Sequence, residues 1–223
     1  MPEVEERLAE VMTAPLDSIV DAGAQVRPSE QVMREWRLPE TDLSALSRWG
    51  LPTDLLQTPD FQSESEPVLV PNVAGPLESR LITREDRLYR LGRWGSHDLT
   101  PWVGAVAGDG RVMAIREEPV TAQDVHPDLR EYYRDLYHPS VDFINSSVAR
   151  LVEISWRWRA VARILTGLEH SLFGAPREVA EAFYDRVREY ERIVLGHVER
   201  IDGHLRADDP SSLWGEVVTD TSH

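Results

Sequence analysis

The stretch VDFINSSVARLVEISWRWRAVARIL, residues 141–165, joins a strand pattern directly to a helix pattern. Its first four residues, 141–144, have the short length of a strand, and three of them, Val141, Phe143 and Ile144, have the β-branched or aromatic side chains typical of one. Asn145, Ser146 and Ser147 follow, and all three are residue types that cap helix N-termini. The helix expected next is apolar on most of its surface, which predicts burial across a sheet. Its apolar positions are Val148, Leu151, Ile154, Trp158, Val161, Ala162 and Leu165.

Segments before this stretch have the pattern of an antiparallel meander. Residues 87–93 and 102–107 are predicted strands, and residues 111–116 are the returning strand of a hairpin. The Gly-Asp-Gly at 108–110 between the last two is a strong turn signal. The apolar piece at 68–70 lies between prolines, which confine strand pairing to sheet edges, so it is predicted to be an edge strand. The sequence therefore predicts a central antiparallel sheet.

Helical patterns precede the sheet. Residues 3–24 have the spacing of an amphipathic helix, and Pro15 either interrupts it or starts a second short helix. Residues 25–40 are polar and contain prolines, so they are predicted to form a loop that could include one turn. Thr41 is expected to cap a short helix that Gly50 closes.

Helical patterns also follow the sheet. Residues 176–205 predict a second long helix, and residues 208–220 predict a short helix that contains Trp214. The order of these elements indicates an α+β fold: N-terminal helices, a central antiparallel sheet, and C-terminal helices packed on it. We divide the chain into an N-terminal helical and loop segment, 1–40, and an α+β domain, 41–223.

The composition excludes several classes of function. The net charge is −15, whereas a nucleic-acid binder needs a basic surface that displaces counterions from phosphates. All 24 basic residues are arginine, so Walker A phosphate loops, Schiff-base enzymes and Ser-Lys hydrolases are excluded. The absence of cysteine excludes thiolate nucleophiles and cysteine-ligated metals. An acidic surface suits a basic protein partner, although it also serves solubility alone.

The chain shows no targeting or membrane pattern. No apolar run reaches the roughly 18 residues that a membrane-spanning helix needs. The first residues are acidic and lack the basic and apolar regions of a signal peptide. We therefore expect a cytoplasmic protein, which agrees with the absence of disulfides.

Three motifs that could carry chemistry have simpler structural explanations. The Gly-Ser-His-Asp at 95–98 holds the residue types of a hydrolase triad. Adjacent residues, however, cannot place their side chains so that the serine bonds to the histidine and the histidine to the aspartate. Gly108 and Gly110 are followed by a strand, whereas a dinucleotide loop opens a helix. His197 and His204 lie about 10 Å apart along a helix, too far for one metal ion. We therefore predict no catalytic residue, no metal site and no cofactor.

The connection 117–139 is the best candidate for a partner-binding surface. Long loops in compact domains tend to be functional, and tyrosines provide anchors in interfaces. Its carboxylates suit a basic protein surface. A solvated insertion without a special role is the alternative. Trp94 is a second candidate anchor, and a core position suits it equally well. The candidate residues are Trp94, Glu117, Glu118, Asp128, Glu131, Tyr132, Tyr133 and Asp135.

Several short motifs occur in an order that resembles a known family. A Gly-Leu-Pro follows the first short helix after residue 40, and a strand ends in Gly92 before a hairpin. An Asn-Ser-Ser then leads into the apolar helix, and an Asp-Asp-Pro with a tryptophan closes the chain. We predict a structural role for these motif residues and for Trp158 on the apolar helix: Gly50, Leu51, Pro52, Asn145, Ser146, Ser147, Trp158 and Trp214.

This order is similar to that of the fourth family of the SUKH superfamily, a group of bacterial immunity proteins, across residues 41–220. The resemblance implies an α+β fold with a curved antiparallel sheet. It also implies that the chain binds and neutralises a cognate polymorphic toxin, often a nuclease or deaminase, without catalysis. The connection 117–139 is longer than the family pattern.

Other interpretations stay open beside the resemblance. The chain could be an intracellular scaffold or regulator that shares the fold and has a non-toxin client. An enzyme that uses Asp, Glu or His is a third interpretation. The Asn-Ser-Ser at 145–147 could be a binding site, although ending a strand and capping a helix is the simpler role.

Overall fold

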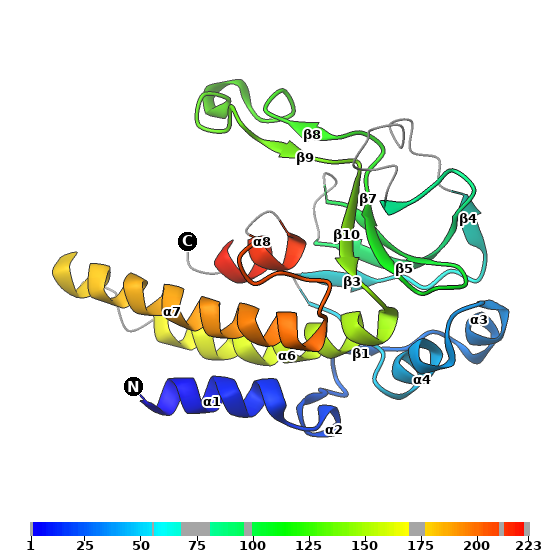
Figure 1. Cartoon of the computed structure of the whole chain (residues 1–223), viewed down its shortest axis with the longest axis horizontal. Helices are drawn as coiled ribbons and strands as arrows, with labels where there is room; N and C mark the ends of the chain where they lie inside the picture. Colours follow the sequence, from blue (N-terminus) through cyan, green and yellow to red (C-terminus); the bar gives the residue numbers. More distant parts are fainter. Residues whose placement is uncertain are drawn as a thin grey trace.

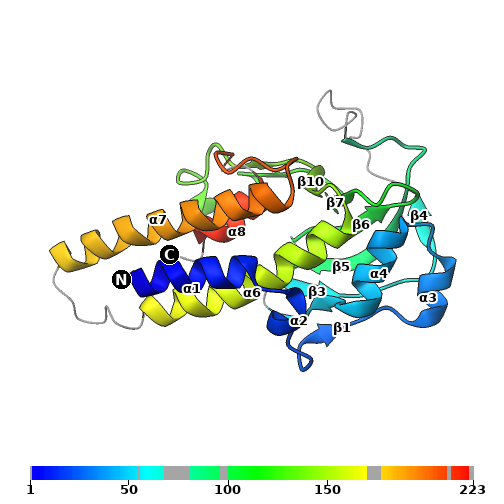
Figure 2. The ribbon, with the colours of Figure 1, turned by 60° about the horizontal axis from the view of Figure 1, so that its bottom comes forward.

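The α+β fold predicted from the sequence is confirmed. The computed structural model places an antiparallel sheet beside a layer of three long helices, α1 (Pro2–Thr13), α6 (Val148–Glu169) and α7 (Arg177–Ile201). These helices lie side by side (Figures 1 and 2). Among the helices that the structure describes, none is long and apolar enough to cross a membrane. The described residues are 2–54, 56–67, 81–95, 100–169, 177–209 and 212–220.

The predicted meander forms the centre of the sheet. The strand order is β10-β7-β6-β5-β3, β4 also pairs with β5, and every pairing is antiparallel. Gly108 and Gly110 turn β6 into β7 with φ angles of 99° and 78°, which glycine adopts without strain. The strands are β3 (Gln57–Pro59), β4 (Ser65–Pro67), β5 (Arg87–Trp94), β6 (Trp102–Val106), β7 (Val112–Ile115) and β10 (Val141–Asn145).

The N-terminal third contains more structure than the sequence predicts. The loop predicted at 25–40 is wrong in part, because Ser29 Oγ accepts a hydrogen bond from the Val32 N–H (3.3 Å) and caps a helix there. Thr41 lies inside the following helix, whose N-cap is Pro39. These elements are α2 (Leu16–Ile19), β1 (Gln25–Val26), α3 (Glu30–Glu35), α4 (Glu40–Arg48) and β2 (Leu51–Pro52), and β1 pairs with β2.

The C-terminal helices follow the prediction more closely. The long helix predicted at 176–205 is α7, which ends at Ile201, and the short helix predicted around Trp214 is α8 (Leu213–Asp220). The edge strand predicted at 68–70 and the side chains of residues 96–98 lie outside the described residues.

Apolar clusters cover both faces of the sheet. Alternate residues of β7 point to opposite faces, as the two-residue period of a strand requires. Val112 and Ala114 join the main core with α6, whereas Met113 and Ile115 join a smaller cluster with Leu88. The N-terminal helix α1 belongs to the main core through its buried Leu8 and Met12. Residues before position 40 therefore share one core with the rest, and the division at residue 40 stays a prediction.

Helix α6 is surrounded by the rest of the chain. Every residue from Ile154 to Trp158, more than one full turn, is buried. Trp156 is fully buried, and its Nε1–H donates to the carbonyl oxygens of Trp49 (3.2 Å) and Gly50 (3.1 Å). These bonds hold the segment from α4 to β2 against the helix.

A buried arginine joins α1 to α6. The Arg157 guanidinium donates to the carbonyl oxygens of Val11 (2.8 Å) and Ala14 (3.0 Å) at the end of α1. Its other nitrogens bind Glu153 Oε1 at 2.9 and 3.2 Å. Carbonyl groups at a helix C-terminus lack partners inside the helix, so this charge caps α1 and is itself satisfied.

Side chains from two elements cap the N-terminus of α6. Asp42 Oδ1 on α4 accepts a hydrogen bond from the Ala149 N–H (2.9 Å), and Ser147 Oγ accepts one from Arg150 N–H (3.2 Å). Burial raises the pKa of Asp42, and the hydrogen bonds from the helix N-terminus act against this increase. A Cβ at Gly110 would lie 2.0 Å from Asp42 Oδ2, so the hairpin turn also packs on this carboxylate.

The Asn-Ser-Ser motif ties β10 to both C-terminal helices. Asn145 Nδ2 and Ser146 N–H donate to the buried Asp202 Oδ2 at 3.0 and 2.7 Å. Trp214 Nε1–H on α8 donates to Asn145 Oδ1 (3.1 Å). Burial raises the pKa of Asp202, but the hydrogen bonds from Ser146, Asn145 and His204 outweigh it and leave the pKa lowered. The motif therefore has a structural role inside the protein.

Trp158→Ala is expected to lower the free energy of unfolding by about 3–5 kcal/mol, as large truncations in a core do. Trp158 is 5% exposed and belongs to the main core. Urea denaturation followed by circular dichroism measures the change. A loss below about 1 kcal/mol, typical of surface changes, would contradict the central place of α6.

Asp202→Ala is expected to cost about 2–4 kcal/mol, because it leaves the buried Asn145 Nδ2 and Ser146 N–H without their acceptor. The lowered pKa adds a pH dependence: the stabilisation is complete above the ordinary aspartate pKa and is lost as the pH falls through the lowered one. Thermal melts of wild type and variant should therefore converge in acid. A constant difference down to about pH 2 would contradict the assignment.

Candidate partner-binding surface

Residues 117–139, here called the arm, leave the sheet after β7 and return at β10. Strands β8 (Val120–Thr121) and β9 (Tyr137–His138) pair antiparallel at the base of the arm. The short 3-10 helix η1 (Pro127–Leu129) lies between them. In Figure 1 the arm projects from the sheet, above α8 and away from the helical layer.

Polar bonds give the arm a defined shape. Asp124 Oδ2 accepts hydrogen bonds from the Thr121 N–H (2.8 Å) and hydroxyl (3.1 Å), and these bonds lower the pKa of Asp124. The Arg130 guanidinium donates to the carbonyl oxygens of Gln123 (2.9 Å) and Val125 (3.2 Å). One of the two arginines of the arm is thus used internally.

The arm holds most of the exposed large apolar side chains. Six such residues are found in the described part of the chain, and four of them are on the arm. Tyr132 is 82% exposed and Tyr137 is 62% exposed, beside the less exposed Tyr133 and Leu129. The other two, Val179 and Tyr184, are on α7. Large exposed apolar groups that gather in one place are typical of interaction sites.

Carboxylates accompany these tyrosines. The predicted residues Glu117, Glu118, Asp128, Glu131 and Asp135 are all exposed. Asp128 faces His126 at 3.6 Å and Asp135 faces Arg134 at 3.4 Å, both in exposed pairs that solvent screens. The arm therefore presents negative charge that is largely available to a partner.

The structure corrects the second candidate anchor, Trp94. This residue is 5% exposed and packs edge-on against Trp214, with ring centroids 5.1 Å apart. Its place at the end of β5 points it into the main core, so it is not a surface anchor. The core alternative for Trp94 is the correct one.

The Gly-Leu-Pro motif is also internal. Gly50 follows the C-terminus of α4 and has a φ of 57°. Its N–H donates to the carbonyl oxygens of Leu46 (3.0 Å) and Ala45 (3.3 Å), which ends the helix. A Cβ there would lie 2.2 Å from the carbonyl oxygen of Val26. Leu51 and Pro52, which form β2, are buried. This motif shapes the fold and does not present a surface.

A charged cluster at the base of the arm was not predicted from the sequence. His138 Nδ1 on β9 lies 3.4 Å from Glu216 Oε1 on α8. Arg116 lies beside them, and burial lowers its pKa while Asp142 and Glu216 act in the opposite direction. No motif spacing connects positions so far apart, so only the fold brings them together.

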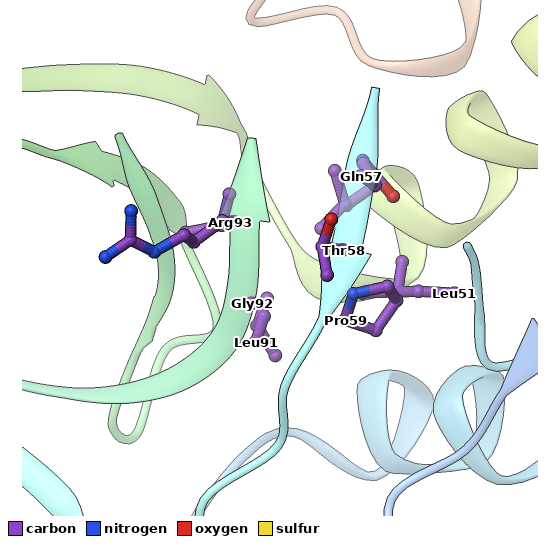
Figure 3. A pocket seen from close by; sticks show the side chains of 9 residues that line it. Leu51, Gln57, Thr58, Pro59, Leu91, Gly92 and Arg93 are labelled. Carbon is purple, nitrogen blue, oxygen red and sulfur yellow. The ribbon is translucent and has the colours of Figure 1, made fainter. Parts of the chain in front are cut away.

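The cavities in the described part of the chain offer little to a small molecule. Figure 3 shows one between β3 and β5, lined by Leu51, Pro59 and Gly92, with a volume of about 10 Å³. This is room for about one water molecule. An open groove of about 630 Å³ lies between α4 and α6, and its most buried charge, Arg157, is already paired. Within the described residues, no group of carboxylates and histidines could hold a metal ion.

One of three comparisons with known proteins gives a match. A family model described as SUKH-4 immunity protein matches residues 11–220, which include the sheet, the arm and both C-terminal helices. No curated protein and no solved structure matches the chain. The match extends over nearly the whole chain, and the chain therefore belongs to the SUKH-4 immunity protein family.

Proposed function

We propose that this chain binds and neutralises a cognate toxin, and that the arm is the surface that makes the contact. The observation that carries the proposal is the gathering of exposed tyrosines and carboxylates on the arm, which projects from a well-packed body. The family membership supports immunity as the biological setting.

The chemistry of the arm favours a basic partner. Tyrosines bury a large area at a small cost in side-chain entropy and dominate many interfaces. Carboxylates around them steer a cationic protein to the surface and discriminate against acidic ones. Nucleases and deaminases that act on nucleic acid carry cationic active sites, and the arm would cover such a site or an adjacent surface.

The proposed mechanism needs neither catalysis nor a cofactor. Binding alone inhibits a toxin if it blocks access to the toxin's active site. We place this action in the cytoplasm, where a nuclease or deaminase toxin would meet its substrate. The α+β domain from residue 41 onward would carry the binding function. A pull-down from the native host followed by mass spectrometry identifies the candidate toxin. Co-expression of the chain with that toxin tests the proposal, and cells that die as fast as without the chain would refute it.

Reversing the charge of Glu117, Glu118, Asp128 and Glu131 to lysine is expected to weaken toxin binding at least tenfold. The melting temperature should stay nearly unchanged, because all four side chains are exposed. Isothermal titration calorimetry at two salt concentrations measures the effect, which should shrink at high salt. If the quadruple variant bound the toxin with wild-type affinity, the carboxylates of the arm would not be part of the binding surface.

Tyr132→Ala is expected to reduce affinity by about thirtyfold, the effect of losing a central aromatic anchor. Tyr184→Ala on α7 is the matched control, since it also removes an exposed tyrosine but lies outside the arm. Surface plasmon resonance should show a faster dissociation rate for Tyr132→Ala only. Equal losses in the two variants would mean that the contact surface is not confined to the arm.

A further inference from the structure

The arm has little stability of its own. Its two strands share only the register pairs Val120 with His138 and Thr121 with Tyr137. An isolated two-stranded hairpin is marginally stable in water even when it is longer than this. The orientation of the arm must therefore depend on contacts with the body.

Among the described residues, polar contacts fix the base of the arm on two sides. On one side, Arg116 donates from its backbone N–H to the Ser140 carbonyl oxygen (2.8 Å) and from Nη1 to the Pro139 carbonyl oxygen (3.0 Å). These bonds join the residue before the arm to the end of the arm and the residue after it. On the other side, His138 Nδ1 faces Glu216 Oε1 at 3.4 Å, which links β9 to α8.

Helix α8 is a rigid support for this second attachment. Trp214, two residues before Glu216, is 1% exposed and bonds to Asn145 Oδ1 (3.1 Å). Its ring packs against the buried Trp94. Glu216 therefore projects from a helix that is anchored in the core, with its side chain 39% exposed beside the 29% exposed His138.

We propose that Glu216 is a positioning residue for partner binding, because it holds the arm in its outward orientation through Arg116 and His138. The proposal rests on the proposed binding function of the arm. It gives α8 a role beyond packing: its carboxylate lies 3.4 Å from His138 Nδ1 and acts, after Asp142, on the charge of Arg116 at the base of the arm.

The proposal predicts a pH dependence. Burial, and then the charge of Arg116, lower the pKa of His138, so the attached arm favours the neutral imidazole. Near neutral pH the charge of Glu216 therefore acts mainly on Arg116, and His138 contacts the carboxylate as a neutral side chain. A released arm would return His138 to an ordinary pKa of about 6.5. The attachment of the arm to the body is therefore strongest above a pH of about 6.5, and it weakens as the pH falls below that value.

The charged groups that face His138 are Arg116 and Glu216; Arg116 also faces Asp142, which Asp209 faces in turn. Burial raises the pKa of Asp142, so protonation of this carboxyl in acid would favour the attached form. The pH dependence that Asp142 gives to the attachment of the arm is opposite to that of His138. The variant His138→Gln removes the contribution of the histidine and leaves that of Asp142.

The first measurement uses the free protein. Hydrogen exchange of peptides from residues 117–139 should be about fivefold faster in Glu216→Gln than in wild type, while peptides from α6 stay unchanged. Glu6→Gln on α1 is the control, since it neutralises an exposed helical carboxylate away from the arm. Unchanged exchange of the arm in Glu216→Gln would overturn the proposal.

The second measurement is the affinity for the purified toxin domain from about pH 7.5 to about pH 5.5. Glu216→Gln should bind about fivefold more weakly at the upper pH, and wild type should lose affinity toward the lower pH. His138→Gln should remove most of that pH dependence. Faster exchange without any loss of affinity would reduce Glu216 to a local structural role and overturn the proposal.

The two proposals can fail separately. If wild type bound no toxin domain, the proposed function would fall, whereas hydrogen exchange would still decide whether Glu216 holds the arm. If wild type bound the toxin and Glu216→Gln bound equally well at every pH, the positioning role would fall and the proposed function would stand.

Discussion

Helix α6 is enclosed by other elements over more than one turn, and the arrangement of the chain follows from this constraint. It contacts α1, α2, α4, α7, β2 and β10. A helix buried this deeply must have its polar groups satisfied by the elements that surround it. Asp42 and Ser147 do so at its N-terminus, Trp156 binds the segment before β2, and Arg157 caps α1. Apolar contacts bring these elements together, and the polar contacts select one arrangement of them.

The molecule separates its stabilising residues from its exposed tyrosines and carboxylates. The residues that resemble the family motifs, among them Asn145, Trp158 and Trp214, are buried in the body. The tyrosines and carboxylates of the arm contribute almost nothing to the core. This separation leaves the arm free to vary in sequence, because changes there do not disturb α6 or the sheet.

Periodicity and turn chemistry predicted the elements whose signals are local. The strands β5, β6, β7 and β10 and the helices α6 and α7 were predicted near their observed bounds, because each carries its own pattern. The tyrosines and carboxylates of the arm are exposed, and the binding role predicted for them stays a prediction. Trp94 is buried, unlike the other candidate residues, because its exposure depends on which face of β5 packs against α8. Trp156 was missed because an enclosed helix has no polar face to mark its orientation.

The sequence by itself determined the antiparallel meander, the enclosed helix that follows it, the absence of lysine and cysteine chemistry, and the acidic, tyrosine-rich arm. These properties depend on neighbours along the chain or on composition alone. Only the tertiary structure decided which polar groups meet: Asp42 with the start of α6, Asp202 with the Asn-Ser-Ser motif, and Glu216 with His138. Such pairs join distant positions, and a hydrogen bond or an ion pair depends on a distance of a few ångströms that no local pattern encodes.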